Sequence, residues 1–206
     1  MLKLTNLTEK NMKTILLITA LLFSLASNAY ANKSEAAEDV KKQVLEPQQQ
    51  CHQFLNFKAT KLRVSEQVDF CQSFKGKALL IVNTASKCGY TPQFKGLEQL
   101  HQQYGERLAV IGFPSNDFRQ EHNTSEQVAE VCYVNYGVTF TMLESSNVSG
   151  LNANVLFKRL SKKTGQAPSW NFGKYLVSNN GESVEYFAPK VKPKDKRLIK
   201  AIESIL

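Results

Sequence analysis

Two continuous runs of apolar residues constrain the fold of this chain more than any other feature of its sequence. Residues 78–82 read ALLIV and residues 108–113 read LAVIGF, so each run has the length of a β-strand. Strands buried on both faces of a sheet carry unbroken runs of this kind. The apolar residues between the runs recur at helical spacing, namely Phe94, Leu97, Leu100 and Tyr104. The sequence therefore predicts a strand, a helix and a second strand parallel to the first.

The remainder of the chain predicts more helices and an antiparallel hairpin. Residues 124–127 read TSEQ, a capping box that starts a helix. Asn-Asn-Gly at 179–181 lies between two expected strands, 174–178 and 183–187, which is typical of a tight hairpin. Apolar periodicity predicts two further helices, at 152–163 and 198–205. Parallel strands on one side, a hairpin at the end and helices on both faces indicate a thioredoxin-like α/β fold with a central mixed sheet.

The first 31 residues have the pattern of a secretory signal peptide. Met12-Lys13 provides a positive start, an apolar stretch runs from Ile15 to Leu25, and Ala29-Tyr30-Ala31 is a small-x-small cleavage site. The apolar stretch is shorter than the roughly 20 residues of a membrane-spanning helix, so we expect no stable membrane insertion. The expected start of translation is Met12, with Met1 as the alternative, and the expected destination is the periplasm.

Cleavage after Ala31 would leave a leader and one domain. Residues 32–50 are charged and glutamine-rich with few large apolar side chains, which predicts a flexible leader before a single domain at 51–206. Removal of three lysines and one glutamate from the 26 basic and 18 acidic residues leaves a net charge of +6. The basic clusters at 157–165 and 189–197 lie far apart and lack interleaved aromatic residues. We expect solvated surfaces and no nucleic-acid partner, with attraction of an anionic thiol as the alternative role.

Cys51 and Cys71 lie on either side of a segment that looks like two short strands. In an exported protein, this arrangement favours a structural disulfide between them, with two separate thiols as the alternative. Closing a loop of about twenty residues would contribute roughly 3 kcal/mol to stability.

Cys88 stands where a buried strand ends and a helix is about to begin. The helix dipole, unpaired backbone N–H groups and the adjacent Lys87 all favour an anion there, and the thiolate is the nucleophilic form of cysteine. The residue three places on is Thr91, so there is no C-x-x-C pair and Cys88 would act as a single attacking sulfur. A small buried core residue is the alternative interpretation.

A single activated thiolate in an exported protein suggests peroxide reduction. The sulfur attacks one oxygen of the O–O bond, the other oxygen leaves as water or an alcohol, and the cysteine becomes a sulfenic acid. Neutral donors such as an amide NH₂ or an indole N–H can stabilise both the thiolate and the leaving oxygen. The only tryptophan is Trp170, just before an expected strand. A core position is the alternative for this residue.

Three separate motifs resemble those of the glutathione peroxidase family. They are VNTASKCGYTPQFKGLEQL at 82–100, GFPSNDFRQE at 112–121 and SWNFGKYLV at 169–177, and the resemblance extends from about residue 76 to residue 188. It implies a cysteine-containing, exported bacterial member that needs no cofactor.

The resemblance also implies a catalytic tetrad of Cys88, Gln120, Trp170 and Asn171. Cys88 would be the peroxidatic residue. Gln120 and Trp170 would donate hydrogen bonds to the sulfur and the departing oxygen, and Asn171 would complete the polar pocket.

The chain departs from the family pattern in three places. The segment between Phe118 and Gln120 is one residue shorter than usual, so Gln120 is assigned from its neighbour Glu121 as well as from spacing. Phe140-Thr141 replaces the family's Phe-Pro. Residues 164–170 form a very short connection that lacks the longer loop by which tetrameric members assemble, so we expect a monomer.

The resemblance leaves two routes for reducing the sulfenic acid. One uses external glutathione, and the other uses Cys132 as an internal resolving cysteine followed by a thioredoxin-like protein. In thioredoxin-dependent members the resolving cysteine lies one position closer to the next phenylalanine than Cys132 does to Phe140. One residue rotates a helix by about 100°. Cys132 shares an apolar face with Val128, so a buried structural thiol is the alternative.

The leading functional hypothesis is a peroxidase acting on hydrogen peroxide and organic hydroperoxides. A redox sensor or binding module of the same fold, in which Cys88 oxidises without turnover, is the alternative, but it does not need the donors of the tetrad. A thiol-disulfide oxidoreductase is disfavoured by the missing C-x-x-C pair. The three histidines, His52, His101 and His122, have no metal-ligand spacing, so we expect no metal.

Overall fold

The computed structural model describes residues 51–206 of the chain. The expected signal peptide at 1–31 and leader at 32–50 lie outside the described residues. Within 51–206, no helix is long and apolar enough to cross a membrane.

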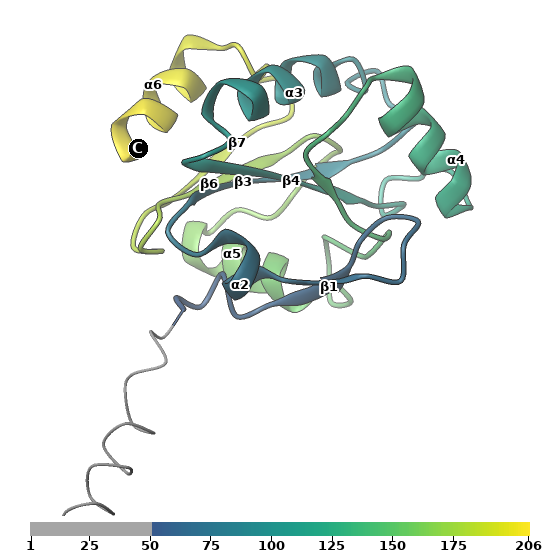
Figure 1. Cartoon of the computed structure of the whole chain (residues 1–206). Coiled ribbons are helices and arrows are strands. Elements are labelled where there is room, and N and C mark those ends of the chain that lie inside the picture. The colour runs from purple at the N-terminus through teal and green to yellow at the C-terminus, as the bar shows by residue number, and fades with distance from the viewer. Residues whose placement is uncertain (1–50) are drawn as a thin grey trace, which may run out of the picture. The chain divides into compact units, whose positions relative to one another are not determined.

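A five-stranded mixed sheet forms the centre of the domain (Figure 1), with the strand order β5-β4-β3-β6-β7. Strand β3 (Ala78–Thr84) pairs in parallel with β4 (Leu108–Pro114), which pairs in parallel with β5 (Thr141–Met142). Strands β6 (Lys174–Val177) and β7 (Val184–Phe187) complete the other half as an antiparallel hairpin beside β3. The predicted mixed sheet and the hairpin are confirmed.

A hydrophobic core lies on each face of the sheet. Successive side chains of the central strands point to opposite faces and therefore enter different cores. In β3, Leu80 and Val82 enter one core, and Leu79 and Ile81 enter the other. Helices cover the sheet on both sides (Figure 1): α3 (Gln93–Tyr104) and α6 (Lys196–Ile205) lie on one face, and α2 (Phe70–Phe74) and α5 (Val155–Thr164) lie on the other. The thioredoxin-like architecture expected from the apolar runs is therefore confirmed.

A small hairpin precedes the sheet, and a disulfide links the residues that flank it. Strands β1 (Lys58–Thr60) and β2 (Gln67–Asp69) pair antiparallel. Cys51 and Cys71 form a disulfide across this hairpin, with their Cα atoms 5.8 Å apart. The disulfide prediction is confirmed.

The helix expected after the capping box has two parts. It begins as α4 (Ser125–Ala129), capped by Thr124, whose hydroxyl oxygen accepts a hydrogen bond from the N–H of Gln127 at 3.4 Å. It continues as a π-helix, η1 (Glu130–Asn135). A π-helix holds one residue more per turn than an α-helix, so this segment accommodates an extra residue that α-helical periodicity does not predict.

Candidate active site

Cys88 lies in the loop between β3 and α3. The residue is buried, with an exposed fraction of 7%. The backbone N–H of Tyr90 points at the sulfur and donates to it at 3.4 Å. An N–H group directed at the sulfur stabilises a thiolate more than a thiol, because the bond to an ion is stronger.

Thr91 holds this loop in place from within the turn. Its hydroxyl oxygen accepts from the N–H of Cys88 at 3.1 Å, and its single O–H can donate to the carbonyl of Cys88 at 2.7 Å or to that of Ala85 at 2.9 Å. The backbone N–H of Thr91 also donates to the carbonyl of Cys88 at 3.0 Å. Thr91 occupies the position at which an exchange motif would have its second cysteine, and its hydrogen bonds stabilise the backbone around Cys88.

Gln120 connects the Cys88 loop to the segment that contains Asn171. The carbonyl of Gln120 accepts from the backbone N–H of Lys87 at 2.9 Å, and its side-chain Oε1 accepts from Nδ2 of Asn171 at 3.0 Å. Because Oε1 accepts this bond, the side-chain NH₂ of Gln120 is the group that can donate to another partner. Arg119, directly before it, has a φ of 58°, and this left-handed residue closes the shortened segment.

Trp170 and Asn171 are consecutive residues with opposite surroundings. Asn171 is fully buried, whereas the Trp170 side chain is 42% exposed and lies against Phe118 with ring centroids 5.6 Å apart. Trp170 and Tyr90 border the same shallow hollow on the surface. The expected tetrad segments therefore meet around the Cys88 loop, with Tyr90 beside both the sulfur and the tryptophan.

Glu121 also supports the Cys88 loop, a role that the sequence did not indicate. Its Oε1 accepts from the N–H of Ser86 at 3.0 Å and from its neighbour His122 at 2.8 Å. The residue is almost fully buried, and this burial raises the pKa of the Glu121 carboxyl above its ordinary value. The sequence signal for this role was the position of Glu121 next to Gln120 in the motif. No local pattern of residues showed that the Glu121 carboxylate would be buried.

Cys132 lies in the π-helix and faces the same hydrophobic core as Cys88. Its side chain is 1% exposed. Burial, and to a lesser degree the charge of Glu121, raise the pKa of the Cys132 thiol to about 12. At neutral pH this thiol is therefore protonated, as expected of a buried structural cysteine, and it lies on the same side of the sheet as Cys88.

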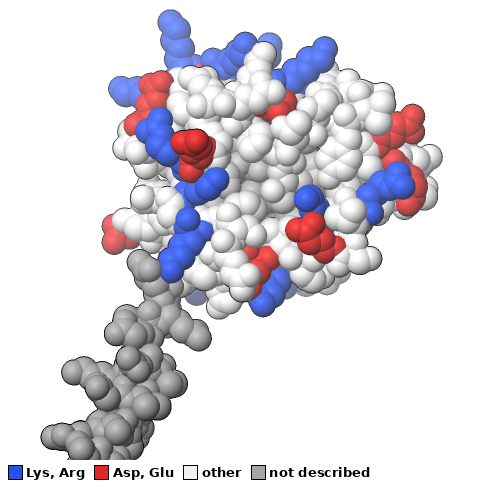
Figure 2. Space-filling model, viewed as in Figure 1, with Lys and Arg blue, Asp and Glu red and all other residues white. Residues whose placement is uncertain are grey.

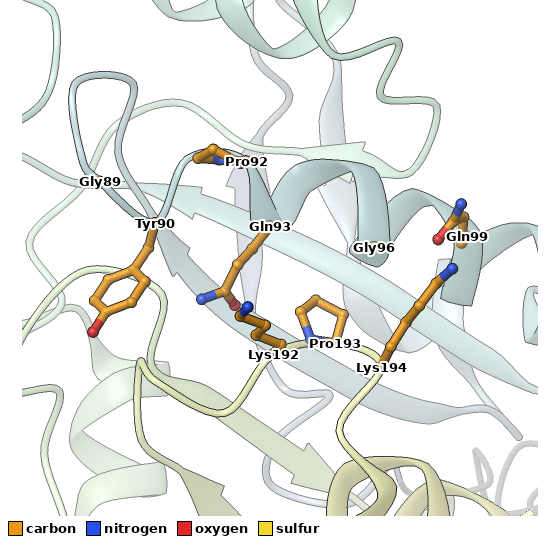
Figure 3. A pocket seen from close by; sticks show the side chains of 9 residues that line it. All are labelled: Gly89, Tyr90, Pro92, Gln93, Gly96, Gln99, Lys192, Pro193 and Lys194. Atoms are coloured by element: carbon orange, nitrogen blue, oxygen red, sulfur yellow. The ribbon is translucent and has the colours of Figure 1, made fainter.

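A groove of about 400 Å³ runs along the start of α3 beside the Cys88 loop (Figure 3). One wall comes from the loop and helix, and the other comes from the segment before α6. The lining residues are Gly89, Tyr90, Pro92, Gln93, Gly96, Gln99, Lys192, Pro193 and Lys194. Figure 3 shows Gln93 on α3 and Lys192 on the segment before α6, on the two walls of the groove.

The second basic cluster of the sequence, 189–197, contributes to this groove. Lys192 and Lys194 line it, and Lys190 borders the adjoining hollow at Trp170. Figure 2 shows Lys and Arg side chains along the upper edge of the molecule, where α3 and α6 lie in Figure 1. Part of the cluster thus forms a positively charged wall of the groove beside the Cys88 loop, in addition to the solvated surface that we expected. Within residues 51–206, no group of three or more His, Cys, Asp or Glu side chains could hold a metal ion.

Comparison with known proteins identifies relatives of this chain. A family model described as glutathione peroxidase matches residues 54–161. A glutathione peroxidase of Lactococcus lactis is 43% identical over 148 residues, which are 69% of this chain and 93% of the relative. A hydroperoxy fatty acid reductase of Synechocystis is 44% identical over 132 residues, 63% of this chain and 85% of the relative. Several other relatives, 43–45% identical, are named glutathione peroxidase-like peroxiredoxins.

The fold is also shared with solved structures. The crystal structure of Trgpx in its apo form superposes with a TM-score of 0.56 at 33% sequence identity, covering 73% of this chain and 95% of that one.

Proposed function

Since the chain belongs to the glutathione peroxidase family, we propose that Cys88 carries its thiol-dependent reduction of peroxides. The Cys88 thiolate attacks one peroxide oxygen and the O–O bond breaks. The second oxygen takes a proton and leaves as water from hydrogen peroxide, or as an alcohol from an organic hydroperoxide. Cys88 is oxidised to a sulfenic acid, and two thiol equivalents then reduce it back to the thiol with release of water.

The observation that supports this proposal is the pair of hydrogen bonds at Gln120. The backbone bond to Lys87 and the side-chain bond to Asn171 join three distant segments at one loop. The amide NH₂ of Gln120 and the indole N–H of Trp170 are neutral donors, so they can bind the sulfur and the leaving oxygen without titrating themselves. Asn171 sets the orientation of the Gln120 amide.

The reductant is a thiol, for which the surface next to Cys88 favours a small anionic molecule such as glutathione. Lys192 and Lys194 line the groove beside the Cys88 loop and would attract its carboxylates. The exposed rings of Trp170 and Tyr90 offer apolar contacts to the chain of an organic hydroperoxide. The name of the Synechocystis relative agrees with such a substrate.

The second candidate is an internal route through Cys132. Its sulfur would attack the sulfenic acid, release water and form a Cys88–Cys132 disulfide, which a thioredoxin-like protein would then reduce. Cys132 is buried and protonated, so η1 would first have to unwind. Short π-helical segments are rare and often occur at functional sites, which supports this candidate.

One coupled assay tests the proposal. The mature protein, peroxide and either glutathione with its reductase or a thioredoxin system should consume NADPH, and Cys88→Ser should consume none. Turnover by Cys88→Ser would contradict the role of Cys88. Oxidation of Cys88 without turnover with either donor would favour the redox sensor instead.

Peptide mapping after peroxide treatment separates the two routes of reduction. A Cys88–Cys132 linkage that Cys132→Ser abolishes would establish the internal route. Activity of Cys132→Ser with glutathione, together with no such linkage in the wild type, would establish the external one.

We also propose that residues 1–31 are a signal peptide and that residues 51–206 act as a monomeric domain in the periplasm. The support for export is the pattern around Met12 and the cleavage site at Ala31. The support for a monomer is the short connection at 164–170. N-terminal sequencing of the periplasmic protein should begin at Asn32, and size-exclusion chromatography with light scattering should give the mass of one chain.

A further inference from the structure

The turn that carries the tryptophan and asparagine of the site immediately precedes β6 and lies beside the end of strand β3. Regular antiparallel pairing of β3 with β6 ends at Val82 and Lys174. One residue beyond this pair, Asn83 is fully buried and faces the turn at 170–173. Asn83 stands five residues before Cys88 on the same strand and loop, so it is joined to both halves of the site.

Asn83 makes three hydrogen bonds to this turn. Its N–H donates to the carbonyl of Gly173 at 3.3 Å, and its carbonyl accepts from the N–H of Phe172 at 2.6 Å. Its side-chain Nδ2 donates to the carbonyl of Trp170 at 3.0 Å. One residue of β3 thus binds three of the four residues of the turn.

The turn requires such restraints because its backbone is strained. Phe172 has a φ of 65°, in the left-handed region that a bulky side chain rarely occupies. Nζ of Lys174 donates to the carbonyl of Phe172 at 2.7 Å, and the Phe172 ring packs edge-on against Phe94 at 5.4 Å between centroids. This turn directs Trp170 toward solvent and Asn171 into the protein.

The carboxamide of Asn83 contributes a bond that its backbone cannot make. Most residues could form the two backbone bonds, but only a side-chain donor of this length reaches the carbonyl of Trp170. Space at the turn is tight, since a Cβ atom on Gly173 would lie 2.6 Å from Oη of Tyr186 and 3.1 Å from Oδ1 of Asn83. Leucine at position 83 would match the shape and leave the Trp170 carbonyl without its donor.

We propose that Asn83 is a positioning residue of the peroxidase, which holds Trp170 and Asn171 in place relative to Cys88. The inference rests on the roles proposed above for those two residues. Asn83 acts through the turn, because its side chain binds the backbone of Trp170 and donates to no reacting atom. Loss of the carboxamide should loosen the turn while the sheet remains intact.

The test uses Asn83→Leu and the shorter Asn83→Ser, which keeps the experiment informative if the leucine variant does not fold. Trp170 is the only tryptophan, so quenching of its fluorescence by acrylamide reports directly on the turn. We expect quenching to rise, and the second-order rate constant for Cys88 oxidation by hydrogen peroxide to fall by about tenfold. Ile81→Val, in the hydrophobic core that contains neither Cys88 nor Phe172, is the control that lowers Tm without changing either measurement.

Wild-type quenching and a wild-type oxidation rate in a folded Asn83 variant would overturn the proposal. A double-mutant cycle then tests the route of the effect. In a Trp170→Phe, Asn171→Ala background, Asn83→Leu should slow oxidation little further, and an undiminished effect would also overturn the proposal. If Cys88 in the Trp170→Phe, Asn171→Ala variant is oxidised at the wild-type rate, the roles proposed for Trp170 and Asn171 are wrong. The quenching result separately decides whether Asn83 holds the turn.

Discussion

Replacement of Lys174 by methionine should change how the stability of this protein depends on pH. Lys174 is fully buried in β6, and Nζ has one hydrogen bond among the described residues, to the carbonyl of Phe172. Burial lowers the pKa of the Lys174 ammonium from 10.5 to about 7. Between these two values the unfolded chain binds one proton more at this side chain than the folded chain does, so the free energy of unfolding rises with pH.

The size of the effect follows from the same two pKa values. Each pH step inside the window is worth about 1.4 kcal/mol, less where the folded group itself begins to titrate. As the pH falls from 9 to 7, the buried Lys174 therefore lowers the free energy of unfolding of the wild type by about 2 kcal/mol. Lys174→Met removes this dependence. It also leaves the Phe172 carbonyl without its donor, at a cost of about 1–3 kcal/mol that does not vary with pH.

Urea unfolding at pH 7, 8 and 9 measures the difference in unfolding free energy between Lys174→Met and the wild type. This difference should move by about 2 kcal/mol in favour of the variant as the pH falls from 9 to 7. Lys162→Met, at an exposed position of α5, is the matched control. Its unfolding free energy should differ from that of the wild type by the same amount at each pH. A constant difference for Lys174→Met would refute the reasoning, because it would mean that the buried amine stays protonated in the folded protein across this window.

Three further predictions concern other parts of the molecule. Replacing Cys51 and Cys71 by alanine should lower the free energy of unfolding by roughly 3 kcal/mol in urea titrations, with little change in peroxidase activity, since both cysteines pack against the hydrophobic core that does not contain Cys88. Gly112→Ala should lower Tm by several degrees in thermal scans, because a Cβ atom would overlap the Met142 side chain, and an unchanged Tm would contradict this packing. Trp170→Phe keeps an aromatic ring but loses the indole N–H, so stopped-flow oxidation of Cys88 should slow by about tenfold or more, and an unaltered rate would remove Trp170 from the proposed mechanism.

Much of the fold was predictable because its signals are local. Residues 78–82 and 108–113 are apolar throughout, and this alone indicates strands covered on both faces. Asn-Asn-Gly at 179–181 predicted the β6–β7 hairpin from three residues. The π-helix was not predictable, because local periodicity continues through it and the extra residue per turn is set by how the segment packs.

The chemistry of the site was only partly visible in the sequence. The context of Cys88 and the absence of a second cysteine at Thr91 indicated a single reactive sulfur. The motifs around Gln120 and Trp170 indicated its neighbours only by resemblance. The roles of Glu121 and Asn83 were not visible, because the Glu121 carboxylate binds Ser86 and Asn83 binds the turn at 170–173, and both partners lie far along the chain.

The sequence by itself indicated the class of fold and the disulfide, and it made Cys88 the candidate nucleophile, since each rests on local patterns of composition and spacing. Only the tertiary structure decided which polar groups became buried and what they bind. Ser86 and Glu121 are 35 residues apart in the chain, and Asn83 and Trp170 are 87 apart. The physical reason is that a hydrogen bond of 3.0 Å requires both partners to be positioned to within a fraction of an ångström, which packing of the whole sheet achieves and local pattern cannot specify.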